Sequence, residues 1–106
     1  MYVGRDFDPA DTGESERYTF DFVNDLNAGD IITSSTWECE VAAVSNGTDP
    51  AAASRIDGEA VINKTRSTQR ITGLLPGVDY AVTATVETLN GDTIRLWSHI
   101  RCREPA

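Results

Sequence analysis

The single histidine, His99, is the first residue to test for catalysis, because imidazole titrates near neutral pH and often serves as a general base. A hydrolase would need a nucleophile and an orienting acid beside it, and no Gly-x-Ser-x-Gly pattern occurs in the sequence. One histidine and two cysteines cannot fill a tetrahedral zinc site without a carboxylate from elsewhere, and their spacings match no zinc pattern. The residue types therefore predict no enzyme, no metal site and no cofactor.

Two groups of acidic residues have spacings that could do chemistry. Glu38 and Glu40 are two positions apart in a predicted strand, so they share one solvent face and do not flank a cleft as glycosidase acids do. Asp6, Asp8 and Asp11 are spaced like part of a calcium loop, but the glycine and the terminal glutamate of such a loop are missing. Both groups are predicted to be solvated.

The two cysteines, Cys39 and Cys102, fall on the apolar faces of their predicted strands. They can be buried free thiols, as in a reducing cytosol, or one disulfide that closes about 64 residues and stabilises the fold by roughly 4 kcal/mol. The sequence begins without a basic segment followed by an apolar one, so it predicts no secretory signal. This favours free thiols over the disulfide.

Length and charge narrow the class of protein. The chain has 106 residues with 17 acidic and 9 basic side chains, a net charge of −8. Residues 1–53 hold 11 acidic and 2 basic side chains, whereas residues 54–106 hold 6 acidic and 7 basic ones. This balance argues against nucleic-acid binding, and no apolar run approaches the roughly 20 residues of a membrane span. We expect one small domain without a deep active-site cleft.

The elements that must position these side chains are strands. Alternating apolar and polar residues predict strands over 18–22, 31–44, 59–63, 67–72, 80–87 and 93–102, with Asn90-Gly91 as a hairpin turn. Six or seven short strands without a helical period indicate an all-β antiparallel sandwich over residues 18–106. Residues 1–17 are predicted to be an extended acidic arm. One predicted face of the second strand holds Ile31, Thr33, Ser35, Trp37, Cys39, Val41 and Ala43.

The last predicted strand carries a second candidate contact. If Ile94, Leu96 and Ile100 point into the core, the alternate residues form an outward aromatic and cationic stripe. Tryptophan and arginine are enriched at interface hot spots. The alternative is a strand covered on both faces, or twisted so that the tryptophan is buried. The residues of the stripe are Arg95, Trp97, His99 and Arg101.

Residues 67–93 resemble the end of a fibronectin type III or related immunoglobulin-like domain, in which a Leu-x-Pro-Gly-x-x-Tyr corner precedes a strand. The matching residues are Leu75, or Leu74, with Pro76, Gly77 and Tyr80. The resemblance implies that the tyrosine hydroxyl bonds to upstream backbone. No cysteine lies two residues after Tyr80, so an antibody-type domain is disfavoured.

Taken whole, the chain resembles small virion proteins of tailed bacteriophages, through its acidic lead-in, AGDIITSSTWECEV, LPGVDY and LWSHIRC. The resemblance implies a non-enzymatic protein of the virion, assembled in the bacterial cytoplasm, first of all a capsid decoration, cement or head-fibre subunit. The alternative is a tail or baseplate module that recognises the host or binds carbohydrate. The implied partners are other virion proteins and further copies in a homo-oligomer. The expected contacts are the stripe and the arm residues Asp6, Asp8, Asp11, Glu14 and Glu16.

Overall fold

The computed structural model of the protein describes residues 10–11, 15–43, 45 and 47–103. These residues form seven strands and one short 3-10 helix. The elements are β1 (Ala10–Asp11), β2 (Ser15–Asp21), β3 (Ile32–Val41), η1 (Ala52–Arg55), β4 (Ile56–Asn63), β5 (Arg66–Thr72), β6 (Asp79–Thr88) and β7 (Thr93–Arg103). No helix among them is long and apolar enough to cross a membrane.

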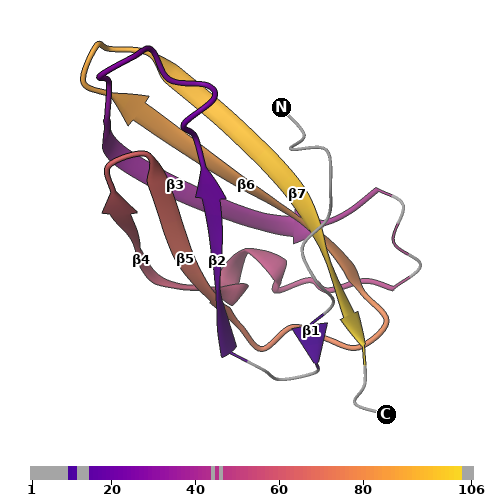
Figure 1. Cartoon of the computed structure of the whole chain (residues 1–106). Coiled ribbons are helices and arrows are strands. Elements are labelled where there is room, and N and C mark those ends of the chain that lie inside the picture. Colours follow the sequence, from indigo (N-terminus) through magenta and orange to yellow (C-terminus); the bar gives the residue numbers. More distant parts are fainter. Residues whose placement is uncertain (1–9, 12–14, 44, 46, 104–106) are drawn as a thin grey trace.

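The strands form two sheets that face each other (Figure 1). One sheet has the order β1-β7-β6-β3 and the other has the order β2-β5-β4. Every pairing is antiparallel except that of β1 with β7, which is parallel. The all-β class predicted from the alternating pattern is therefore confirmed.

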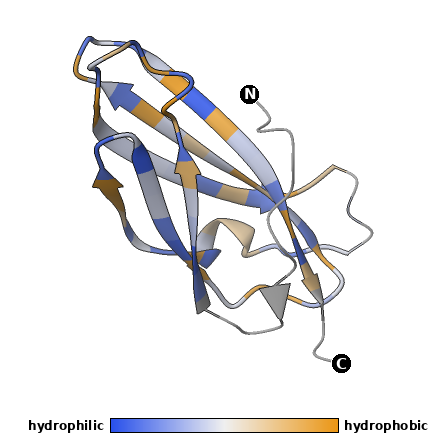
Figure 2. Ribbon diagram, in the orientation of Figure 1, coloured by the Kyte–Doolittle hydropathy of each residue, from blue (hydrophilic) through white to orange (hydrophobic). Residues whose placement is uncertain are grey.

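The core lies between the sheets and follows the period-two pattern of the strands. In β6, the side chains of Tyr80, Val82, Ala84 and Val86 are fully buried, while the residues between them face outward. Figure 2 shows this alternation as hydrophobic and hydrophilic bands along the strands. From β3, Trp37 reaches across the core and stacks on Phe20 of β2 with ring centroids 4.9 Å apart. The aromatic contact ties the two sheets together.

The predicted face of β3 is wrong at both ends. Ile32 is buried at 4% exposure, whereas Ile31 is 39% exposed. The register with β6 shifts between Ile32 and Ser34, and one extra residue in a strand moves all earlier side chains to the opposite face. At the other end, β3 stops at Val41, so that Ala42 is buried while Ala43 is exposed. Only the middle of the strand keeps the predicted alternation.

The N-terminal boundary also differs from the prediction. Strand β2 begins at Ser15, three residues before Tyr18, and pairs with β5 along its whole length. Glu16 and Arg17 therefore belong to the sheet, because backbone pairing continues where the side chains are polar. The backbone of Asp11 lies in β1 beside Arg103 of β7. Of the five acidic residues predicted as arm contacts, Asp6, Asp8 and Glu14 lie outside the described residues.

Candidate functional site

The outer face of the four-stranded sheet carries the predicted stripe of β7. Leu96 and Ile100 are buried, so the alternate side chains of Arg95, Trp97, His99 and Arg101 are on the opposite face. Arg95 and Arg101 are exposed, whereas the two rings between them are half-buried. These rings meet edge to face, with centroids 5.2 Å apart. The structure thus brings the four predicted residues together in one row.

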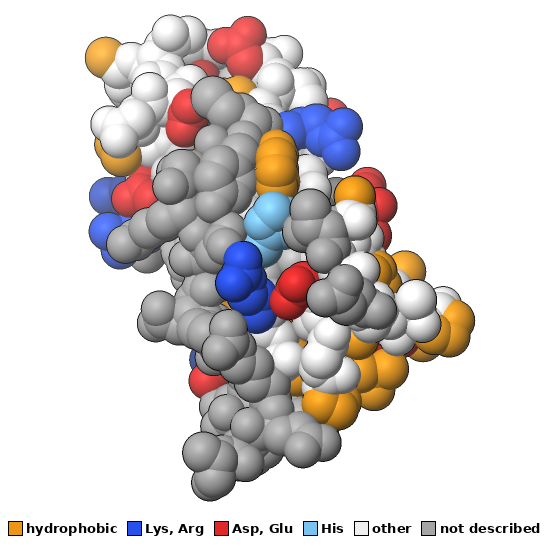
Figure 3. Space-filling model, turned by 90° about the vertical axis from the view of Figure 1, so that its right-hand side faces the viewer, with side chains coloured by type: hydrophobic (Ala, Val, Ile, Leu, Met, Phe, Trp, Pro, Cys, Tyr) orange, Lys and Arg blue, Asp and Glu red, His pale blue; other side chains and the backbone are white. Residues whose placement is uncertain are grey.

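The neighbouring strands complete this face. Ala81 and Thr83 of β6 lie opposite His99 and Trp97, and Glu40 of β3 lies beyond Ala81. Because the middle row has small side chains, a shallow depression of about 300 Å³ lies between the rings and the Glu40 side. Figure 3 shows the histidine on this face with basic, acidic and hydrophobic side chains around it. One side of the depression is formed by the rings of Trp97 and His99, and the other side carries the Glu40 carboxylate.

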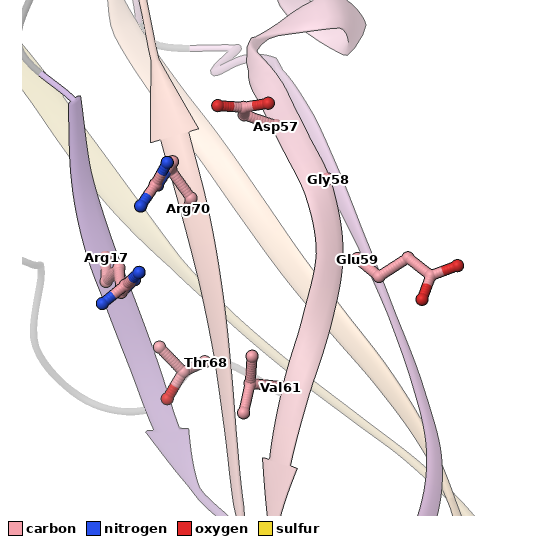
Figure 4. Close-up of a pocket in the computed structure, with 7 residues that line it drawn as sticks. All are labelled: Arg17, Asp57, Gly58, Glu59, Val61, Thr68 and Arg70. Carbon is pink, nitrogen blue, oxygen red and sulfur yellow. The ribbon is translucent and has the colours of Figure 1, made fainter.

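A second hollow, of about 210 Å³, lies on the outer face of the other sheet (Figure 4). Arg17 of β2 is directly opposite Arg70 of β5, and Asp57 of β4 is opposite Arg70 on the other side. Like charges at directly opposite positions destabilise a sheet unless other groups offset them. Asp57 and Glu59 also line this hollow, although Glu59 points away from the arginines (Figure 4). The charges here balance, so the hollow is a weaker candidate for a binding site.

Behind these surfaces, a buried ion pair holds the loop before η1 against the corner before β6. Arg55 Nε donates to Asp49 Oδ2 at 2.9 Å, and the Asp49 side chain is only 1% exposed. The Tyr80 hydroxyl donates to the same carboxylate at 2.8 Å and accepts the Leu75 N–H at 2.9 Å. The Ala51 N–H donates to Asp49 Oδ1. Asp49 therefore organises two loops and the start of a core strand.

The tyrosine corner needs two glycines for geometric reasons. Gly77 has φ +74, a left-handed conformation that suits glycine after Pro76. Gly47 lies so close to the corner that an added Cβ would be 2.6 Å from the Gly77 carbonyl oxygen. The Tyr80 bond follows the expected corner, whereas Asp49 and Arg55 were missed. The only sequence signal for this pair is an acidic and a basic residue that lie six positions apart, on either side of a short helical turn.

This network makes the stability of the fold depend on pH in the acid range. The Arg55 hydrogen bonds, helped by Tyr80 and Ala51, outweigh burial and lower the pKa of Asp49 from 3.8 to about 2. As the pH falls, the Asp49 carboxylate is therefore protonated in the unfolded chain before it is protonated in the folded protein. We expect about 2 kcal/mol of unfolding free energy to be present above pH 4 and to be lost as the pH falls through about 2.

Urea unfolding of wild type and Asp49→Asn between pH 6 and pH 2 measures this contribution. The variant should be less stable at pH 6 and should show a flatter dependence on pH. Parallel curves for the two proteins would mean that another carboxylate carries the acid sensitivity. Asp21, whose pKa is also lowered although it is exposed, is the first alternative to examine.

Cys39 and Cys102 are free and buried. They lie on β3 and β7, with β6 between them, so two strand spacings of about 4.8 Å separate the strands that carry them. A disulfide requires Cα atoms within about 7 Å of each other. The fold therefore holds the thiols too far apart to be joined.

Both thiols are expected to be inert in the folded protein. Burial, with a smaller effect of Asp49, raises the pKa of Cys39 to about 12, so the reactive thiolate is scarce at pH 8. Ellman's reagent at pH 8 should find almost no thiol in the native protein and two thiols in denaturant without reductant. Two thiols that appear only after reduction would reveal a disulfide.

The remaining candidates do not form a reaction centre. Glu38 and Glu40 are both exposed on the outer face of β3, as the alternation predicts. Glu16 is exposed on β2. Among the described residues, no three His, Cys, Asp or Glu side chains gather closely enough to hold a metal ion. What the arrangement offers is surfaces with mixed charge and aromatic rings, suited to protein contacts.

The comparisons with known proteins point in the same direction. A search of the curated proteins found no match. A family model described as Podophage GP4 fiber-tail adaptor protein gp77 matches residues 10–96. The matched range runs from β1 into β7 and includes every strand of both sheets at least in part. The match supports a structural protein of the phage virion. The chain belongs to the podophage fiber-tail adaptor family.

Proposed function

We propose that the protein is an adaptor subunit that joins a fibre to the tail of a podophage virion through protein contacts. The observation that carries this proposal is the family match over residues 10–96. The structure is consistent with it, because its hollows are shallow and its outer faces carry charged and aromatic side chains. A rigid sandwich between two larger assemblies needs only surfaces that fit each of them.

The proposed location in the virion is the tail, and not the capsid that the sequence resemblance implied first. The resemblance of the sequence to small phage proteins implied a capsid decoration or head fibre first, and a tail module as the alternative. The family description names a fibre and a tail, which favours the tail location. It names no glycan, so carbohydrate recognition does not enter the proposal.

We also propose that the sandwich is of the immunoglobulin-like type. The orders β2-β5-β4 and β7-β6-β3 correspond to strands B-E-D and G-F-C of a constant-type immunoglobulin domain. The tyrosine corner before β6 and the buried Trp37 on β3 occupy the positions that such a domain would give them. Such a scaffold presents one outer sheet face on each side.

In this role, the β7 stripe serves as one contact surface. Its rings supply contact area at low entropic cost, and Arg95 and Arg101 at its ends can pair with carboxylates of a neighbour. Several copies around the tail axis would multiply weak contacts, which makes a homo-oligomer in the assembly part of the proposal. The contacts expected of the acidic arm residues with other virion proteins stay a prediction.

Immunogold labelling of intact virions with an antibody against the protein tests the location. Gold is expected at the tail, at the position where the fibres begin. Particles that lack the protein should have tails without fibres and otherwise complete capsids. Label spread over the capsid shell, or normal fibres on particles that lack the protein, would contradict the adaptor role.

A further inference from the structure

The four-stranded sheet ends at β3, and no further strand pairs with this edge in the described part of the chain. β3 pairs with β6 alone, from Ile32 to Val41. An edge strand leaves the N–H and C=O groups of every second residue without a ladder partner. Such a row is a template for an added strand.

The register identifies the outward groups. The Ala42 N–H donates to the Asp79 carbonyl at 2.8 Å, and bonded pairs alternate with non-bonded pairs along an antiparallel ladder. Counting back along β3, the residues that bond to β6 are Glu40, Glu38 and Thr36. The residues whose backbone groups point away from β6 are Cys39, Trp37 and Ser35. Among the described residues, no other backbone group bonds to this outward row.

A groove follows this edge, between β3 and the segment from η1 to β4. It consists of two hollows of about 350 and 550 Å³, and Trp37 and Ile56 line both of them. Ala53 and Ala60 add further apolar lining. We call this feature the β3 groove. Its floor is apolar, and one wall carries the unpaired backbone groups of β3.

On the β4 side of the groove, two backbone carbonyl groups are bonded from within the domain. The register of β4 with β5 lapses between Asp57 and Val61, which frees carbonyl groups at this bulge. The buried side chain of Gln69 fills the gap, because its Nε2 donates to the Asp57 and Gly58 carbonyl oxygens at 3.0 and 3.1 Å. The row of outward backbone groups that can take an added strand beside the glutamates is that of β3.

The charged side chains of the β3 groove are all acidic. Glu38 and Glu40 line one hollow and Glu59 lines the other, and neither hollow is lined by lysine or arginine. A second copy paired edge to edge would set these glutamates against their own counterparts, and like charges opposite each other destabilise a sheet. A basic strand from a different protein complements this groove in both backbone and charge.

We propose that the β3 groove binds an extended, basic segment of a neighbouring virion protein, which adds to β3 as an extra strand. This inference rests on the proposed adaptor function and names the chemistry of one partner. Alternate side chains of the added strand would face Glu38 and Glu40, and these are lysine or arginine. The side chains between them would face Ile56 and Ala53, and these are small or apolar.

Hydrogen exchange measured by NMR tests the groove directly, with a short peptide of alternating lysine and valine as the probe. In the free protein, the amides of Ser35, Trp37 and Cys39 should exchange faster than those of Glu38 and Glu40. Excess lysine peptide should slow the three outward amides, and a matched glutamate peptide should not. Equal effects of the two peptides, or none with lysine, would overturn the proposal.

The charge-reversal variant Glu38→Lys/Glu40→Lys should bind the lysine peptide about tenfold more weakly, as expected for the loss of two exposed ion pairs. The matched control is Glu87→Lys/Asp92→Lys, which reverses two exposed acidic residues on β6 and in the turn after it, neither of which lines the groove. The control should bind like wild type. A control that weakens binding as much as the double variant would contradict a local site, since only net charge would then matter.

Assembly of particles separates this inference from the proposed function. Wild-type protein that is absent from tails would defeat the adaptor role itself. Where wild type is present on tails that carry fibres, a folded double variant is expected to leave tails without the fibre or without the adaptor. Double-variant particles that keep both would refute the β3 groove while the adaptor role stands.

Discussion

Replacing Asp49 with alanine is expected to lower the free energy of unfolding by about 3–5 kcal/mol, the cost of removing one partner from a buried ion pair. Arg55, whose side chain is only 21% exposed, would keep its charge without its carboxylate. The Tyr80 hydroxyl and the Ala51 N–H would also lose their acceptor. Because small domains have about 5–15 kcal/mol of stability in total, this one change approaches the unfolding threshold. Urea unfolding followed by circular dichroism measures it.

The matched control for this variant is Asp57→Ala. Asp57 is exposed and forms no ion pair with the described residues, although it lies opposite Arg70, so its loss should stay within about 1 kcal/mol. The double variant Asp49→Ala/Arg55→Ala should be more stable than the sum of its single losses, because it leaves no uncompensated charge. Equal losses for Asp49→Ala and Asp57→Ala would show that the buried pair does not hold the corner.

Trp37→Ala should cost about 3–5 kcal/mol, because it removes a large buried side chain from between the sheets. It breaks the stacking on Phe20 and the hydrogen bond from Trp37 Nε1 to Ser67 Oγ at 2.8 Å. The Ser67 side chain is fully buried and keeps its contact with Ser35. Trp37→Phe keeps a stacking ring but loses the donor and part of the buried ring volume, so we expect a smaller loss of about 1–3 kcal/mol. Urea unfolding at neutral pH compares these variants.

The second tryptophan is the control for Trp37. Trp97 is half-buried on the outer face of β7, away from the space between the sheets. Trp97→Ala should therefore destabilise the domain less than Trp37→Ala. If Trp97 is a contact residue, its loss should instead weaken attachment to particles. A larger loss of stability from Trp97 than from Trp37 would reverse the roles assigned to the two rings.

Local sequence patterns predicted the strands well where one face is buried and the other is wet. The alternation in β6 and β7 and the Asn90-Gly91 turn give the hairpin directly, and its register follows from the turn. The bulge near Thr33 was not predictable, because both Ile31 and Ile32 fit an apolar face equally well. The start of β2 was not predicted because Glu16 and Arg17 are polar. Backbone hydrogen bonds extend the strand there without requiring apolar side chains.

Of the candidate surfaces, one could be predicted from local sequence and one could not. The β7 stripe could be derived from one strand, since alternation alone puts Arg95 and Trp97 on the same face. The β3 groove depends on which strand ends the sheet and on the path of the chain from η1 to β4. Sheet order is set by packing between distant segments, so Glu38 and Glu59 gave no sign of sharing a groove. The Asp49–Arg55 pair was hidden for the same reason, because loops far from Tyr80 in sequence meet at the corner.

The parallel pairing of β1 with β7 has a mechanical consequence. Ala10 lies beside Cys102 and Asp11 beside Arg103, with both strands running in the same direction. A force that pulls the two ends of the described chain apart drags these strands past each other along their length. The hydrogen bonds between them are then loaded together in shear, and do not open one at a time as in a peeled hairpin. A subunit that links a fibre to a tail would resist tension best when strained along this direction.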